Sequence, residues 1–223
     1  MPGDGQTVTV PPARLTREEK KAQTRERLLE AARTVFARRG FASSSLDEVA
    51  EEAGLTKGAV YSNFANKEDL VLAVLEESFN RRMDDIVSRV DSDAPLEEQA
   101  RLGGALFMAI SEEERWLDLL SLDFFTYAAR NPEFSARLAA RHRESLAAIA
   151  DVIIESSTDG GWPLPLPAEK LALVVNALGS GLSMEQLVDP EAVPDELFGE
   201  VIALIWAGAD AGQSPGKAGT APS

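Results

Sequence analysis

The chain has 223 residues, 44% of them hydrophobic and 26% charged, which suits a globular protein with one sizeable domain or a small domain plus a larger one. It has no cysteine and one histidine, which excludes disulfides, thiol catalysis and His/Cys metal sites of the usual kind. The net charge of −15 argues against nucleic acid as a partner, but residues 14–67 hold eleven Lys and Arg against eight Asp and Glu. Any DNA contact is therefore expected near the N-terminus, because the acidic remainder would repel DNA.

The two ends of the chain differ from the rest in composition. Residues 1–15 and 208–223 are rich in Gly, Pro and small polar residues, which predicts a disordered arm and a disordered tail.

The N-terminus lacks the apolar core of a secretory signal, and no run of about eighteen apolar residues suggests a membrane span. We therefore expect a cytoplasmic protein with no membrane partner.

Everything between the two ends reads as helical, without a strand pattern or an internal repeat. The first helix is predicted to begin at a capping box, Thr16 with Glu19, and to end at Gly40. Ser44 or Ser45 caps the second helix. The third helix spans about 57–64, and the fourth begins after residue 66 and runs to about 90. Five more are predicted at about 96–110, 112–129, 132–155, 168–187 and 195–207, which gives an all-α fold of about nine helices.

The second helix, a turn at Gly54 and the short third helix form a helix-turn-helix pattern. In such a unit the third helix presents its N-terminal residues to the major groove. Lys57 lies at that end, and Tyr61 lies one turn later on the same face. Val60 and Phe64 point to the other side, into a small core. The polar face is therefore free to meet phosphates or base edges.

The segment GFASSSLDEVAEEAGLTKGAVYSNFANKEDL resembles the DNA-binding signature of the TetR (tetracycline-repressor-like) family of bacterial regulators. The Gly-aromatic pair, the Ala-Gly turn, the Lys-Gly start of the third helix, its Tyr-x-x-Phe ending and the Lys-Glu-x-Leu opening of the fourth occur in order. The resemblance, over roughly residues 16–75, implies a DNA-binding domain at 16–66 and a ligand-binding and dimerisation domain at 67–207. It also implies DNA contacts, mostly to phosphates, by Ser44, Ser45, Thr56, Lys57, Gly58, Tyr61, Ser62, Asn63 and Lys67.

Taken singly, these residues have plainer interpretations. Ser44 could only cap a helix, and Lys57 or Lys67 could be solvated surface residues. The ordered combination is what favours DNA contact. A basic stripe precedes the unit, because Arg14, Arg17, Lys21 and Arg25 recur every three to four positions. It fits either a solvated face or an added phosphate or minor-groove contact.

The middle of the chain is rich in large apolar side chains. Apolar residues cover most faces of helix 112–129, which predicts that this helix is buried in the centre of its domain. Each large residue alone is more often core, but together with a few polar groups they match an apolar ligand pocket, which the resemblance also implies. The expected lining residues are Phe107, Met108, Trp116, Leu120, Phe124, Tyr127 and Asn176. His142 is expected to be exposed.

The last two helices carry features of an interface. Two glycines interrupt the pattern of helix 168–187, and each costs about 1 kcal/mol relative to Ala, which a close helix–helix approach would offset. Packing within the chain is the alternative. The resemblance favours a homodimer in which these helices pair with their copies in a four-helix bundle. The expected interface residues are Gly179, Gly181, Leu182, Leu197, Val201, Leu204 and Ile205.

The sequence thus predicts a ligand-responsive transcriptional regulator. We expect a homodimeric repressor that binds a palindromic operator in double-stranded DNA and is released by a small apolar or amphipathic effector. The alternative is a DNA-binding regulator whose C-terminal domain only dimerises or docks a protein partner, without a pocket. An enzyme is not expected, because the sequence offers no metal cluster, no Gly-rich phosphate loop and no evident catalytic pair. No cofactor is expected either.

Overall fold

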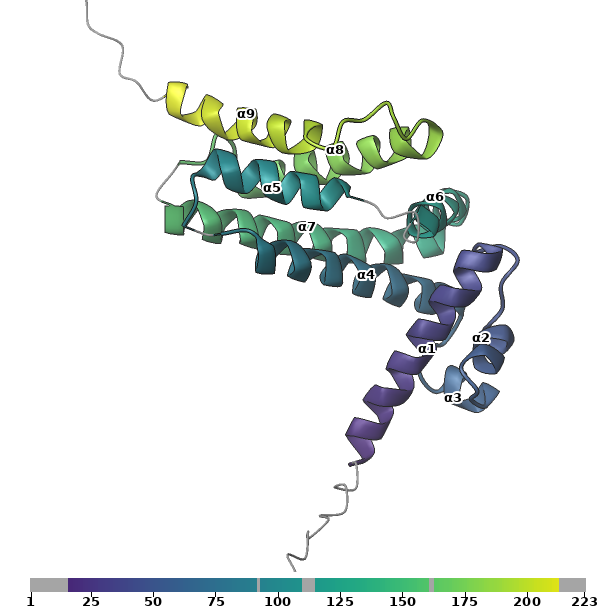
Figure 1. Ribbon diagram of the computed structural model, residues 1–223. Coiled ribbons are helices and arrows are strands. Elements are labelled where there is room, and N and C mark those ends of the chain that lie inside the picture. The colour runs from purple at the N-terminus through teal and green to yellow at the C-terminus, as the bar shows by residue number, and fades with distance from the viewer. Residues whose placement is uncertain (1–15, 92, 110–114, 161–162, 213–223) are drawn as a thin grey trace, which may run out of the picture.

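The computed structural model describes residues 16–91, 93–109, 115–160 and 163–212. In this part of the chain the secondary structure is helical throughout, and the predicted all-α fold is confirmed (Figure 1). The nine helices of the described residues are α1 (Arg17–Arg39), α2 (Leu46–Glu52), α3 (Lys57–Tyr61), α4 (Lys67–Arg89), α5 (Leu96–Met108), α6 (Arg115–Arg130), α7 (Pro132–Gly160), α8 (Ala168–Val188) and α9 (Leu197–Gly212). The predicted N-terminal arm and residues 213–223 of the predicted tail lie outside the described residues.

Local capping signals set the starts of the first helices. Thr16 accepts a hydrogen bond from the backbone N–H of Glu19, whose carboxylate accepts one from the N–H of Thr16. The hydrogen bond with the Thr16 backbone is the main cause that lowers the pKa of Glu19, and the bond with the Thr16 side chain adds to it. Ser45 and Glu48 form the same box on α2, so Ser45 and not Ser44 is the cap. Both capping boxes satisfy amides that a helix start leaves free.

Several helix ends differ from the prediction. The third helix ends at Tyr61 and not near residue 64, because the side chains of Ser62 and Asn63 donate to the carbonyl of Ala59 and compete with the next helical turn. The last helix continues to Gly212, into the segment predicted as tail. Residues 110 and 112–114, at the predicted junction of the fifth and sixth helices, lie outside the described residues.

The helices enclose two apolar cores. The first joins α1–α3 to the first turns of α4, to α6 and to the start of α7. Phe41, between α1 and α2, packs edge-on against Phe124 of α6, with ring centroids 5.5 Å apart. The second core joins α5, α7, α8 and α9. The prediction that the sixth helix is buried on most faces is wrong, because Leu119 and Phe125 are exposed.

The arrangement in space separates the N-terminal helices from the rest. The unit of α1–α3 projects from one end of a stack made by α4, α5, α7, α8 and α9 (Figure 1). By length and composition alone, α8 is apolar enough to cross a membrane, which for a single helix is weak evidence. Core helices of soluble proteins meet the same criterion, and α8 packs against α5, α7 and α9.

Candidate functional site

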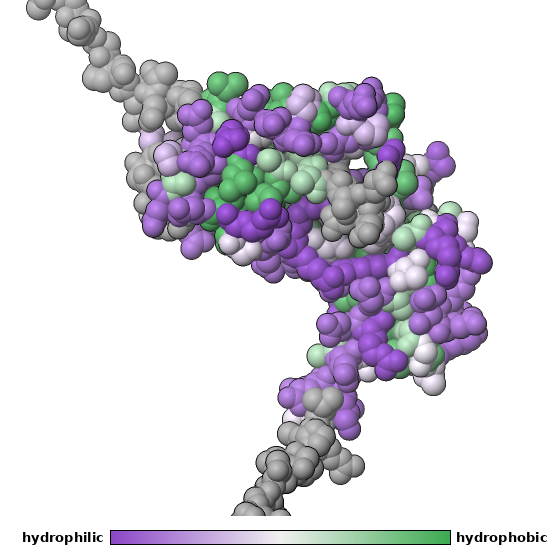
Figure 2. Space-filling view, viewed as in Figure 1, coloured by the Kyte–Doolittle hydropathy of each residue, from purple (hydrophilic) through white to green (hydrophobic). Residues whose placement is uncertain are grey.

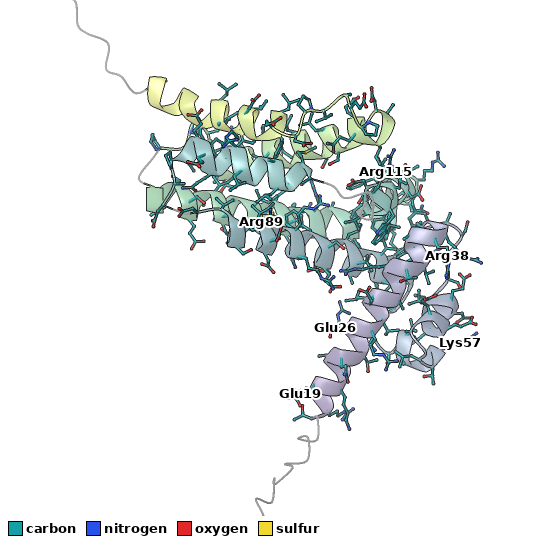
Figure 3. The ribbon with its side chains drawn as sticks, viewed as in Figure 1. Glu19, Glu26, Arg38, Lys57, Arg89 and Arg115 are labelled. Atoms are coloured by element: carbon teal, nitrogen blue, oxygen red, sulfur yellow. The ribbon has the colours of Figure 1, made fainter. Side chains whose placement is uncertain are left out.

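The exposed face of α3 is the first candidate site. Thr56 caps the helix by accepting from the N–H of Ala59 at 3.2 Å. Val60 and Phe64 are buried beneath it, as predicted, while the Tyr61 side chain is 55% exposed. Lys57, Gly58 and Ser62 are also exposed, and Asn63 is half-buried. The inner face alone anchors the helix, which leaves its polar face accessible (Figure 3).

Lys57 at the start of α3 is held by an acid of α2. Its Nζ donates to Asp47 Oδ2 at 2.5 Å. This hydrogen bond, and next the charge of Asp47, raise the pKa of Lys57. The ammonium group is therefore charged and held beside α3, and a phosphate would have to replace Asp47 as its partner.

Lys67 and Ser44 have a different environment. The Nζ of Lys67 donates to the carbonyl oxygens of Phe41 at 2.7 Å and Ser44 at 2.9 Å, with Ala42 at 3.4 Å. It also lies 4.4 Å above the Phe41 ring. Burial lowers the pKa of Lys67, and the charges of Glu68 and Glu48 oppose that shift. Ser44 is buried and donates to the Phe41 carbonyl. Both residues stabilise the turn between α1 and α2. Nothing in the local sequence pattern predicts this role.

A cavity of about 390 Å³ is the second candidate site. Five helices, α4 to α8, bound it, and this volume lies in the usual range of small-molecule sites. Its wall is mainly apolar, with Leu72, Leu75, Phe79, Phe107, Leu122, Phe125, Leu138 and Met184. One edge of α8 adds Asn176, Ser180 and Ser183. The described residues include no group of three or more His, Asp and Glu placed to hold a metal ion.

The expected pocket residues are only partly brought together. Phe107 and Asn176 line this cavity, and Trp116 lines a separate hollow between α1 and α4–α6. Met108 belongs to the second core, while Leu120, Phe124 and Tyr127 pack in or against the first. The Tyr127 hydroxyl donates to Glu68 at 2.8 Å, which raises the pKa of Tyr127.

The cavity also contains residues that the sequence did not suggest. No residue of α4 or α7 was among the expected lining residues, because apolar periodicity marks a helix face without naming what it faces. His142, expected to be exposed, is half-buried in the cavity wall, so that expectation is wrong.

The separate hollow lies where α1 meets α4. There Arg33 Nη2 lies 3.2 Å from Glu77 Oε2, and the Arg33 side chain is only 12% exposed. Arg81, one turn further along α4, also pairs with Glu77, at 2.6 Å. The Arg33–Glu77 pair connects the N-terminal unit to the middle of α4.

The expected interface residues divide between the inside and the outside of the subunit. A Cβ on Gly179 would lie 2.6 Å from Cε1 of Phe107, so this glycine serves a close approach within the chain. Leu182, Leu197 and Ile205 pack against the second core, and Val201 is half-buried. Gly181 has open space around it, and Leu204 is 70% exposed.

An apolar stripe runs along the outside of α8. It consists of Leu173, Val174, Ala177, Gly181, Met184 and Val188, all exposed. Their spacing of three to four residues places them on one face of the helix. Apolar surface is visible along the α8–α9 edge of the molecule (Figure 2). An exposed apolar stripe of this kind is a candidate binding surface.

Comparison with known proteins assigns both parts of the chain. Residues 28–74 match the model of bacterial regulatory proteins of the tetR family, and residues 98–205 match that of the BetI-type transcriptional repressor C-terminal domain. The HTH-type transcriptional regulator TtgR of Pseudomonas putida is 28% identical over 204 residues, covering 88% of this chain and 94% of the relative.

Solved structures show the same fold. A TetR-family regulator from Rhodococcus superposes with a TM-score of 0.67 at 22% identity, covering 83% of this chain and 99% of that one. FadR from Bacillus subtilis, solved with stearoyl-CoA, superposes with a TM-score of 0.62 at 16% identity, covering 82% and 98%. With both halves matched by TetR-type models and the helix-turn-helix in place, the chain belongs to the TetR family of bacterial DNA-binding transcriptional regulators, which are not enzymes.

Proposed function

We propose that this chain is a cytoplasmic, ligand-responsive repressor. It binds a palindromic operator as a homodimer, through residues 16–66, and a small apolar or amphipathic effector in the domain of residues 67–207 releases it. The observation that carries the proposal is the cavity, because one of its walls is the helix that also carries the DNA-binding unit. The match of residues 98–205 to a repressor-type domain supports the direction of the response.

The proposed mechanism depends on the two faces of α4. Its first turns are buried in the core of the N-terminal unit, with Leu70, Val71 and Val74 among the contacts. Leu75 and Phe79, one turn further along, face the cavity. An effector that fits the cavity better at one position of α4 favours that position and alters the spacing of the two α3 helices in the dimer. Moving the equilibrium from 1:99 to 99:1 takes a difference of about 5.5 kcal/mol in effector binding.

The cavity favours an effector with an apolar body and a few hydrogen-bonding groups. Asn176, Ser180 and Ser183 form a polar edge along α8, facing aromatic side chains of α4 and α5. Arg141, which also lines the cavity, is paired with Glu76 and lies 3.6 Å from Glu144. Its charge is therefore already balanced within the protein.

The α8 stripe supports the homodimer. Gly181 lies in the middle of the stripe, and a Cβ added there would have no atom within 4 Å, so a second α8 can approach its backbone closely. The second candidate function uses the same stripe to dock a protein partner and has no pocket. The cavity weighs against it, since that candidate requires a filled core.

The first experiment is a genome-fragment pull-down with the purified protein, beside the variant Lys57→Ala/Tyr61→Ala. A short palindromic motif that is enriched by the wild type and absent with the variant supports the regulator.

Operator binding is then measured with compounds that bind the cavity. If no such compound changes the operator affinity, the ligand response is ruled out and the partner-docking candidate takes its place.

A further inference from the structure

The first turns of α1 project beyond the core of the N-terminal unit. The first buried residue of this helix is Leu28, and of residues 17–27 all are exposed except Thr24, which is half-buried. These eleven residues extend roughly 16 Å as a helix. The Thr16–Glu19 capping box fixes the start of the helix although little packs against it. The projecting turns are visible below α3 (Figure 1).

The charges of this segment are segregated around the helix. At 100° per residue, Arg17, Lys20, Lys21, Arg25 and Arg27 occupy one side. Glu19 and Glu26 occupy the opposite side, and Glu18 lies at the boundary. Figure 3 shows Glu19 and Glu26 on the flank of α1 that is turned away from α3 and Lys57.

Two of the arginines show which way the basic side faces. The Arg25 guanidinium lies 4.7 Å above the ring of Phe64, just after α3. The Arg27 Nη2 donates to the carbonyl of Ala53, at the end of α2, at 2.8 Å. Lys21 lies one turn before Arg25, and Arg17 one turn before Lys21. The basic side therefore faces the side of the molecule on which α2 and α3 lie.

The remaining cations of the unit are largely neutralised. The ion pairs are Lys57 with Asp47, Arg38 with Glu52, Arg39 with Glu48, and Arg33 with Glu30 and Glu77. In contrast, Arg17, Lys20 and Lys21 are exposed and form no ion pair with any residue that the structure describes. The uncompensated positive charge of the DNA-binding unit is thus concentrated on the projecting turns.

We propose that Arg17, Lys20 and Lys21 form a second DNA contact, which binds the sugar–phosphate backbone beside the groove that α3 enters. The position of this contact rests on the proposed DNA-binding role of α3. Its chemistry does not, because cations bind phosphates irrespective of sequence. The contact adds affinity for all DNA and a corresponding salt dependence, and it sets the orientation of α3 without reading bases.

The test compares two triple variants with the same change in charge. Arg17→Gln/Lys20→Gln/Lys21→Gln removes the proposed contact, and Arg101→Gln/Arg130→Gln/Arg143→Gln removes three exposed cations of the larger domain. Glutamine keeps helix propensity, which circular dichroism checks.

Binding to a short random-sequence duplex is measured by fluorescence anisotropy over a range of salt concentrations. The first variant should bind about tenfold more weakly or worse, with a salt slope shallower by about 0.9 for each phosphate that it no longer neutralises. The second should match the wild type.

The inference is overturned if the first variant keeps the wild-type affinity and salt slope, or if both variants bind equally weakly because of net charge. Either result leaves the proposed function standing where the pull-down still finds a palindrome that depends on Lys57 and Tyr61. Conversely, a fall in duplex affinity in the first variant alone supports the second DNA contact even where no specific operator emerges.

Discussion

Lys57 and Lys67 each occupy the first position of a helix, yet the fold gives them opposite environments. Lys57 is exposed, and the hydrogen bond and charge of Asp47 raise its pKa. Lys67 is half-buried, and burial lowers its pKa while its ammonium group donates to carbonyls of the α1–α2 turn. Lys57 can exchange its carboxylate for a phosphate at little cost. Lys67 would have to leave the backbone carbonyls of that turn, of which the Phe41 carbonyl keeps a second donor, the Ser44 hydroxyl.

Replacing Lys67 by methionine should therefore act on stability first. The substitution removes charge-assisted bonds to the carbonyls of Phe41 and Ser44, and the partial exposure of the site limits the effect to about 1–2 kcal/mol. Urea unfolding measures it. The control, Lys57→Met, should leave stability nearly unchanged and weaken DNA binding. Wild-type stability of Lys67→Met with weakened DNA binding would instead make Lys67 a direct DNA contact.

Asp47→Asn should strengthen binding to DNA of any sequence. The Asp47 carboxylate binds the Lys57 ammonium group and therefore competes with phosphate for it. The neutral asparagine amide of the variant does not compete. We expect a few-fold increase in affinity for a random duplex and a steeper salt slope, by about 0.9 if Lys57 then binds one more phosphate. Glu51→Gln, an exposed acid of the same helix, removes an equal charge. An identical increase in that control would trace the effect to net charge alone.

At the scale of helices, the sequence predicts what is decided locally. The capping boxes at Thr16 and Ser45, and the exposed face of α3, depend on residues within three or four positions of one another. The cavity does not. The placement of α1 and α4 decides which side of α6 meets Phe41 and which side meets the cavity. Phe124 was therefore expected in the pocket, whereas it packs against Phe41. The environment of Lys67 likewise depends on residues more than twenty positions away.

The two glycines of α8 are a matched pair for testing how helices approach. Gly179→Ala places a methyl group 2.6 Å from the Phe107 ring, which is stacked on Phe198, and should cost about 1–2 kcal/mol of stability through overpacking. Gly181→Ala meets no atom of its own chain and should stabilise the subunit by about 0.5–1 kcal/mol. Thermal unfolding compares the two, and both glycines behaving alike would contradict the packing.

Gly181→Ala also tests the proposed dimer. If the α8 stripe pairs with its copy, the added methyl group lies in the interface and should weaken dimerisation while it stabilises the subunit. Sedimentation at several protein concentrations separates these two effects. A Gly181→Ala protein whose dimer dissociates like the wild type would place the interface away from the middle of α8.

At the scale of the whole molecule, α4 belongs to both candidate sites. Its first turns share the core of the DNA-binding unit, and its middle lines the cavity. Arg33 of α1 reaches this middle part through its pair with Glu77, in a site that is mostly shielded from water. We therefore expect a displacement of α4 at the cavity to reach α1 at two places, the shared core and this ion pair.

Arg33→Met should weaken the coupling between effector and operator more than it weakens either binding reaction. Glu77 keeps Arg81 as a partner, so the substitution removes the link to α1 without leaving the carboxylate unpaired. Coupling is reciprocal, so the factor by which a cavity-binding compound lowers operator affinity equals the factor by which operator lowers compound affinity. We expect this factor to fall several-fold in Arg33→Met, measured by titrating each ligand with and without the other. Arg38→Met, whose partner Glu52 lies within the N-terminal unit, should retain it. Equal coupling in both variants would show that the shared core alone transmits the signal.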